Sequence, residues 1–157
     1  GLHRAAGEEA MAGVKQNALS CVLRIRGARG SALLAGDIER EQEEALVAAL
    51  GRTGLQTDLL LVPHHGSKTS SSGPFLDAVG PRLAVVQAGY RNRFGHPARE
   101  VLARYEARGV GVADTPVCGG LRWHSSEPDR WQCERESSQR YWAHGMRTQE
   151  PPGHRPR

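Results

Sequence analysis

Three groups of side chains that can bind cations or transfer protons follow apolar runs in the sequence. Asp37 and the His64–His65 pair come almost directly after two of these runs, and His96 lies in the loop after a third. Carboxylate and imidazole groups are ligands for divalent cations such as zinc or manganese. In open α/β sheets, ligands bind beyond the carboxyl ends of the strands. A cation site is therefore predicted if the three runs are strands of one sheet.

Each of these residues also has a purely structural interpretation. Asp37 can cap the helix that follows it, the histidine pair can lie in a surface loop, and His96 alone can be an exposed loop residue. An apolar run that leads directly into Pro-His-His-Gly favours a site, because Gly66 permits a sharp turn or a close backbone approach. Ser67 stands beside the histidines, but a hydroxyl and an imidazole this close in sequence do not establish the geometry of a catalytic triad.

Length and composition narrow the class of protein. The 157 residues, with 38% hydrophobic and 24% charged side chains, are typical of one globular domain. The net charge of +4 permits a polyanionic partner, and no run approaches the roughly 20 apolar residues of a membrane-spanning helix. Three widely spaced cysteines exclude a dense disulfide framework and a CxxC zinc knuckle. Walker, GxSxG and dinucleotide-binding motifs are absent.

The pattern of apolar residues predicts the elements that would position the candidate residues. Residues 19–26 and 31–35 are typical of a hairpin around a turn at 27–30. The run at 58–63 is almost continuously apolar, as in a strand that is buried on both faces. The further elements expected are helices at 39–51, 74–79 and 98–108 and strands at 83–88, 110–115 and 121–123. The order ββα, βα, βα, ββ predicts an α/β fold with a mixed sheet.

The helix expected at 39–51 has suitable residues at both ends. Four acidic residues lie in its first turns, where negative charge suits the helix dipole: Glu39, Glu41, Glu43 and Glu44. Gly51 fits the position just after the last turn, where glycine often takes a left-handed conformation.

The two ends of the chain differ from its middle. We expect residues 1–16 to be a lead-in, residues 17–125 to form the domain, and residues 126–157 to be a basic, disordered tail. The sequence starts at Gly1, with neither an initiator Met nor the apolar core of a signal peptide. We therefore expect it to be a piece of a longer protein.

Three motifs, taken in order, resemble one protein family. Residues 36–39 are GDIE, residues 60–71 are LLVPHHGSKTSS, and residues 89–97 are GYRNRFGHP. Together they resemble the metallo-β-lactamase-like C-terminal domain of the ComEC DNA-uptake channel of competent bacteria. The segments KQNALSCV at 15–22 and RYW at 140–142 fit the same pattern, so the resemblance covers roughly residues 15–142.

The resemblance implies an αββα sandwich that holds two divalent metal ions, zinc or manganese, at the edges of its sheets. Asp37 would bridge or cap the metals, and His65 is the preferred imidazole ligand, with His64 as the second choice. His96 would bind phosphate or shuttle a proton near the site. The family carries an HxHxDH motif upstream of these residues, and nothing before Gly36 matches it. The chain is therefore expected to be the C-terminal half of the domain, inactive by itself and prone to aggregate through an uncovered sheet.

The family function implied is hydrolysis of the DNA strand that is not transported during natural transformation. Two metal ions would activate a water molecule and clamp both oxygens of a phosphodiester. The candidate contacts to the substrate are Ser67, Lys68, Thr69, Arg91 and Arg93, and Tyr90 and Phe94 could stack on bases.

The resemblance also implies partners and a location. The partners are DNA and the rest of the membrane channel, without a small-molecule cofactor. The parent protein would lie in the bacterial inner membrane, with this domain facing away from the cytoplasm. Two alternatives stay open: a DNA-binding module without catalysis, and a hydrolase that acts on another phosphoester, such as a phosphorylcholine ester. Whether this chain is itself an enzyme also stays open.

Overall fold

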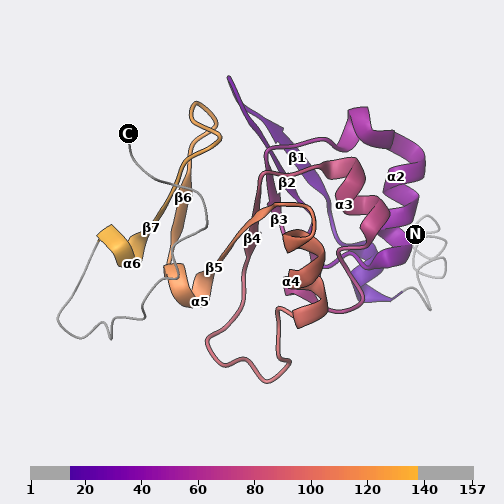
Figure 1. The fold of residues 1–157 in the computed structure, drawn as a ribbon. Helices are drawn as coiled ribbons and strands as arrows, with labels where there is room; N and C mark the ends of the chain where they lie inside the picture. Colours follow the sequence, from indigo (N-terminus) through magenta and orange to yellow (C-terminus); the bar gives the residue numbers. More distant parts are fainter. Residues whose placement is uncertain (1–14, 138–157) are drawn as a thin grey trace, which may run out of the picture.

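A mixed β-sheet lies at the centre of the computed structural model, which describes residues 15–137 (Figure 1). The strand order in the sheet follows the sequence, and β1 pairs antiparallel with β2 while all later pairs are parallel. The strands are β1 (Leu23–Arg26), β2 (Ser31–Leu34), β3 (Leu59–Leu61), β4 (Leu83–Val86) and β5 (Gly111–Asp114). The predicted α/β fold with a mixed sheet is thus confirmed.

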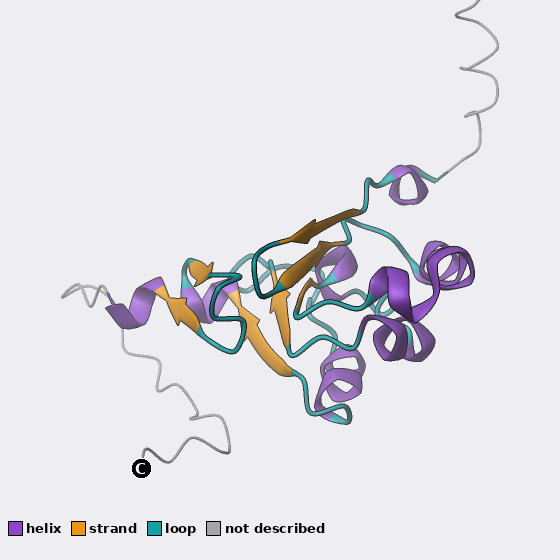
Figure 2. Cartoon of the chain, turned by 90° about the horizontal axis from the view of Figure 1, so that it is seen from above, coloured by secondary structure: helices purple, strands orange, loops and turns teal. Residues whose placement is uncertain are grey.

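Three helices cover one face of this sheet (Figures 1 and 2). They are α2 (Arg40–Leu55), α3 (Gly73–Val79) and α4 (Arg99–Glu106), and each connects two neighbouring parallel strands. Because the parallel strands are added in one direction and crossovers share one hand, every connecting helix falls on the same side. The core between helices and sheet includes Leu33, Leu60 and Val86 from the strands and Phe75 and Tyr105 from the helices.

Helix α2 extends beyond its predicted end. Gly51 has a left-handed φ of 57°, as expected for the residue that follows a last helical turn. The chain then resumes a helical turn up to Leu55, whose side chain is only 1% exposed. Burial of Leu55 explains this extra turn, which the polar sequence between the two residues does not indicate.

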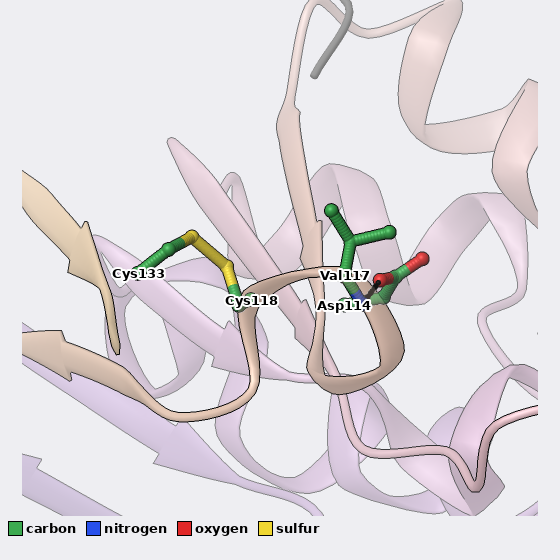
Figure 3. Close-up of a disulfide and its surroundings, with 4 residues drawn as sticks. All are labelled: Asp114, Val117, Cys118 and Cys133. Carbon is green, nitrogen blue, oxygen red and sulfur yellow. Dashed lines mark hydrogen bonds between the residues drawn. A yellow bond between two sulfur atoms is a disulfide. The ribbon is translucent and has the colours of Figure 1, made fainter. Parts of the chain in front are cut away.

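A small hairpin covers part of the opposite face of the sheet (Figure 2). It consists of β6 (Leu121–Trp123) and β7 (Trp131–Cys133), between α5 (Thr115–Cys118) and α6 (Glu134–Ser137). Cys118 and Cys133 form a disulfide, and the Asp114 carboxylate caps α5 by accepting a hydrogen bond from Val117 N (2.9 Å; Figure 3). Folded structure therefore continues past residue 125, where a disordered tail was expected to begin, because the disulfide and the β6–β7 pairing hold residues 131–133. The rest of that predicted tail, residues 138–157, lies outside the described residues, as do residues 1–14.

The β6–β7 hairpin does not cover the β1 side of this face of the sheet. Leu23 and Ile25 lie on the same side of the sheet as Ala32, which packs in the second apolar cluster. Their side chains are 54% and 48% exposed, respectively. Within the described residues, no helix is long and apolar enough to cross a membrane.

Candidate functional site

The candidate site lies at the carboxyl ends of the parallel strands. Asp37 follows β2, and the two histidines lie in the short helix η2 (Pro63–Gly66) that follows β3. Since β2 and β3 are parallel neighbours, both segments leave the sheet at the same edge. The Oδ1 atom of Asp37 is 3.5 Å from Nε2 of His65. The structure thus brings together a carboxylate and an imidazole that are separate in the sequence.

The hydrogen bond made by the second ring nitrogen of His65 determines which nitrogen of the neutral ring carries the hydrogen. Nδ1 lies 2.7 Å from the backbone carbonyl oxygen of Gln87, the residue directly after β4. Because a carbonyl oxygen only accepts, Nδ1 carries a hydrogen, and in the neutral ring Nε2 presents a lone pair toward Asp37. Histidines that bind metals commonly use one nitrogen for a backbone carbonyl and the other for the metal. The pair therefore fits a divalent cation, and a proton at Nε2 would instead give an ion pair.

The backbone around the histidines is held in an uncommon conformation. His64 and His65 have left-handed φ values of 49° and 55°, which residues with a Cβ rarely adopt. The turn is anchored because His64 N donates to Gly36 O (2.9 Å) and Ala98 N donates to Gly66 O (2.9 Å). Backbone strain of this kind is concentrated at functional sites. Here it turns the chain so that His65 faces the end of β2.

His64 points to different partners. Its Nδ1 is 3.4 Å from Oε1 of Glu39 and 3.4 Å from the Thr69 hydroxyl. The two histidines therefore have separate neighbours: Asp37 faces His65, the imidazole preferred as a ligand from the sequence, and Glu39 faces His64.

His96 approaches the same edge from the loop between β4 and α4. Its ring centroid is 6.1 Å from that of His64, and it stacks on Phe94 at 5.9 Å. Its Nδ1 is buried and has no hydrogen-bond partner within residues 15–137. Burial lowers the pKa of His96 below its usual value of 6.5, and the nearby His64 and His65 rings lower it further. Both effects favour the neutral form of the His96 ring.

A cavity of about 470 Å³ opens beside His65 and His96. This volume falls in the range of small-molecule sites. The lining residues are His65, Gln87, Ala88, Gly89, Asn92, Phe94, His96 and Thr115. The cavity thus adjoins the Asp37–His65 pair.

The loop that borders this cavity carries two exposed aromatic rings with arginines over them. Tyr90 is 59% and Phe94 is 67% exposed. The guanidinium of Arg91 lies 5.2 Å from the centroid of the Tyr90 ring, and that of Arg93 lies 4.8 Å from the centroid of the Phe94 ring. Arginine stacked on an aromatic ring is a surface that suits nucleobases and phosphates.

The other predicted substrate contacts differ in accessibility. Ser67 is only 8% exposed, and its hydroxyl lies 3.1 Å from that of Thr69. Thr69 and Lys68 are exposed. Lys68 and Thr69 can thus reach a ligand in solvent, whereas the Ser67 side chain is directed to its neighbour.

A buried glutamate supports the segment after the histidines. The Glu43 side chain is fully buried, and its carboxylate accepts hydrogen bonds from Ser71 N (2.6 Å) and Ser72 N (2.8 Å). The Ser71 hydroxyl in turn lies 3.0 Å from the Tyr105 hydroxyl, and Arg104 donates to Ser71 O (3.1 Å). This network ties α2 and α4 to the chain between η2 and α3.

Comparison with known proteins gives related sequences. The chain is 40% identical over 110 residues to "Competence protein ComA" of Neisseria gonorrhoeae, which is 70% of this chain and 16% of that protein. It is 36% identical over 106 residues to "Recombination protein 2" of Haemophilus influenzae (68% and 13%). It is 32% identical over 108 residues to "ComE operon protein 3" of Bacillus subtilis (69% and 14%). No protein-family model matches.

These similarities support a competence-related family. The prediction drawn from the three sequence motifs is confirmed at this level. The chain spans only 13–16% of the length of these three relatives.

The described part of the chain brings few potential metal ligands together. Within residues 15–137, no group of three or more His, Cys, Asp or Glu residues could hold a metal ion. Structural zinc takes four protein ligands and catalytic zinc usually takes three. The Asp37–His65 pair offers two such groups, fewer than either kind of zinc site takes.

Two contributors to the site were missed in the sequence. His65 contacts the backbone carbonyl of Gln87, so the residue type at position 87 does not indicate this contact. Its position directly after β4 does place it at the edge of the sheet. Glu43 was read only as a favourable charge in the first turns of a helix. Its buried role depends on the packing of α2 against α3, and no local pattern in the sequence indicates it.

Proposed function

We propose that this chain is part of a metal-dependent phosphodiesterase domain that cleaves DNA during natural transformation. The observation that carries the proposal is the Asp37–His65 pair, in which a backbone carbonyl leaves the imidazole Nε2 free toward a carboxylate. The names of the relatives, which include a competence protein and a ComE operon protein, give the biological context.

In this proposal, each residue of the edge has its own task. Asp37 and His65 would hold metal, and Gln87 O keeps the His65 ring in one orientation. Two bound divalent metal ions, zinc or manganese, would supply an activated water and charge stabilisation for a phosphodiester. Neutral His96 accepts or returns a proton beside the cavity. Arg91 and Arg93 hold phosphates by charge at the rim of the site.

Because two ligands do not fill the coordination sphere of a metal, the 157-residue chain alone should bind metal weakly and cleave DNA little. The remaining ligands would come from the HxHxDH segment of the longer protein. Joining that segment should also cover the exposed Leu23 and Ile25 side chains and reduce aggregation.

The disulfide supports a location outside the cytoplasm. Disulfides persist in oxidising compartments and are rare in the cytosol, and Cys118 is bonded to Cys133. We place the parent protein in the inner membrane, with this domain on the outer side and the rest of the channel as its partner.

The test compares this chain with a longer protein that carries the HxHxDH segment. Metal content and cleavage of single-stranded DNA are measured for both, and for Asp37→Ala, His65→Ala and His64→Ala in the longer protein. The longer protein should bind about two metal ions and cleave DNA, and Asp37→Ala and His65→Ala should abolish cleavage. His64→Ala serves as the matched control and should retain more metal than His65→Ala. A longer protein that binds metal but leaves DNA intact would mean that the substrate is a different phosphoester.

A second candidate function, DNA binding without catalysis, is favoured by the exposed Tyr90 and Phe94 rings with their arginines. Under it, DNA affinity would survive EDTA and weaken with salt. Tyr90→Ala and Phe94→Ala would each lower affinity, while Asp37→Ala would leave it unchanged. Loss of all DNA affinity in EDTA would exclude this second function.

A further inference from the structure

A second cavity lies at the opposite end of the sheet from the histidines. It has a volume of about 490 Å³ and lies where the chain enters the parallel strands. Arginine, threonine and one aspartate side chain dominate its lining, chiefly Arg24, Arg52, Arg82, Thr57 and Asp58. No residue of the Asp37–His65 site lines it, so the two cavities are separate.

Thr57 places a hydroxyl without a partner in this lining. The side chain is only 4% exposed, and Oγ1 has no hydrogen-bond partner within the described residues. Its backbone N–H is already satisfied by Val79 O at 3.0 Å. Buried polar atoms without partners are uncommon, because each costs free energy unless water or a ligand satisfies it. Thr57 lines the cavity, so an acceptor bound there is the candidate for the missing partner.

Arg24 contributes a second free donor in a fixed position. Its Nη1 donates to Gly54 O (2.8 Å) and its Nη2 donates to Gln56 O (2.5 Å), at the end of α2. The Nε atom of the same guanidinium is buried and has no partner within residues 15–137. Since the two anchored nitrogens hold the planar group in place, the N–H at Nε is preorganised for an acceptor.

The charges of the lining favour an anion. Arg24, Arg52 and Arg82 bring three guanidinium groups, and Asp58 brings the one carboxylate of the lining. Oδ2 of Asp58 is already occupied by Ser31, whose N–H and hydroxyl lie at 2.8 and 3.3 Å. Arg82 also pairs with Asp129 on the turn between β6 and β7. An acceptor-rich anion can thus use donors that the protein leaves free.

We propose that this cavity binds a phosphate group, with the Thr57 hydroxyl and Arg24 Nε as donors and Arg52 and Arg82 as charge partners. Phosphate supplies several acceptor oxygens, which match an arrangement of hydroxyl and guanidinium donors. The group can be a free phosphate or nucleotide, or a phosphodiester of a nucleic acid strand. The inference is independent of the proposed nuclease function, because it uses no residue of the carboxyl edge.

The test measures binding of inorganic phosphate to the 157-residue chain by isothermal titration calorimetry. EDTA is present throughout, so that metal at Asp37 and His65 cannot contribute. Thr57→Val removes the hydroxyl with little change of shape and should weaken phosphate binding at least tenfold. Arg52→Met should weaken it as well, whereas Thr57→Ser, which keeps the hydroxyl, should retain most of the affinity. Arg99→Met, an exposed arginine on α4 outside the lining, is the matched charge control.

Two further measurements check that the variants are folded and identify the molecule that carries the phosphate. Thermal unfolding without phosphate checks the fold, and Thr57→Val should keep wild-type stability because the hydroxyl it loses has no partner in the free protein. Competition with a single-stranded oligonucleotide identifies the source: displacement of phosphate by the strand indicates a nucleic acid, and displacement by a mononucleotide alone indicates a free ligand. Absence of saturable phosphate binding by the wild type, or equal affinity in Thr57→Val and Arg99→Met, would overturn the proposal and leave a water-filled cavity.

Discussion

The two ends of the parallel strands collect opposite kinds of hydrogen-bonding group. At the carboxyl end, Asp37 and the Nε2 atom of His65 are acceptors 3.5 Å apart, an arrangement that suits a cation. At the amino end, the free Thr57 hydroxyl and Arg24 Nε are donors, an arrangement that suits an anion. At the carboxyl end the left-handed backbone includes two residues with a Cβ, His64 and His65, whereas near the amino end the positive φ values of Gly51 and Gly80 fall on glycines. The comparison shows that one sheet can offer acceptors for a cation at one end and donors for an anion at the other. The two ends also differ in the backbone conformations that they use.

The largest effect should come from removing the buried support of the carboxyl end. Glu43→Ala leaves the N–H groups of Ser71 and Ser72 buried without an acceptor, and should lower the free energy of unfolding by about 3 kcal/mol or more. Urea denaturation measures the change. Glu44→Ala, at an exposed position on the same helix, should stay within about 0.5 kcal/mol of wild type. Equal losses in the two variants would mean that the buried network does not hold this end.

The left-handed backbone of the carboxyl end can be tested at Gly66. Its φ is 80°, and an added Cβ would lie 2.7 Å from Cβ of Pro97. Gly66→Ala should therefore lower the free energy of unfolding by about 2 kcal/mol, from backbone strain and overpacking together. Gly51→Ala is the matched control, because its φ is 57° but nothing lies within 4 Å of the added Cβ. A cost near 1 kcal/mol is expected there, and chemical denaturation that gives both variants the same cost would contradict the contact with Pro97.

At the amino end, loss of the helix anchor should have a smaller effect. Arg24→Met keeps an apolar stem but removes the donors to Gly54 O and Gln56 O, so a loss of about 1 kcal/mol is expected. Arg26→Met on the same strand, an exposed position, should cost little. Thermal unfolding of both variants measures the difference. If Arg24→Met is as stable as Arg26→Met, the amino end does not depend on this anchor.

The smallest effect concerns the pH dependence of the carboxyl end. The pKa of His96 is lowered in the folded chain, chiefly by burial, so the unfolded state binds the proton more readily. This contribution to stability is complete above the unfolded value of 6.5 and is lost as the pH falls below it. His96→Gln should flatten the pH dependence of the unfolding free energy below pH 6.5 and leave its slope at pH 8 unchanged. A variant with a steeper acid dependence than wild type would refute the assignment.

Much of the fold could be predicted from the sequence because its signals are local. The apolar runs that became β3 and β4, the β1–β2 hairpin and the glycine at position 51 each follow from residue types at short spacing. The edge that gathers Asp37 and His65 also follows, since polar residues directly after parallel strands share one side of a sheet.

Other features depend on contacts between distant residues and left no local signal. Cys118 and Cys133 are separated by 15 residues, and their bond extends the folded structure into a polar segment that resembles a tail. Glu43 is indistinguishable in sequence from its exposed neighbour Glu44 until α3 packs against α2. The free donors of Thr57 and Arg24 can be recognised only when the cavity they line is known.

The strand order of the sheet has a consequence for how the chain folds. Each strand pairs with the strand before it in the sequence, so no pairing must wait for a distant part of the chain. The entropy of loop closure therefore stays modest at each step, which favours rapid folding. The sheet can therefore grow stepwise from β1 to β5 as successive parts of the chain become available. The Cys118–Cys133 bond joins residues that follow β5, so oxidation of these two thiols would report that the domain has been completed as far as β7.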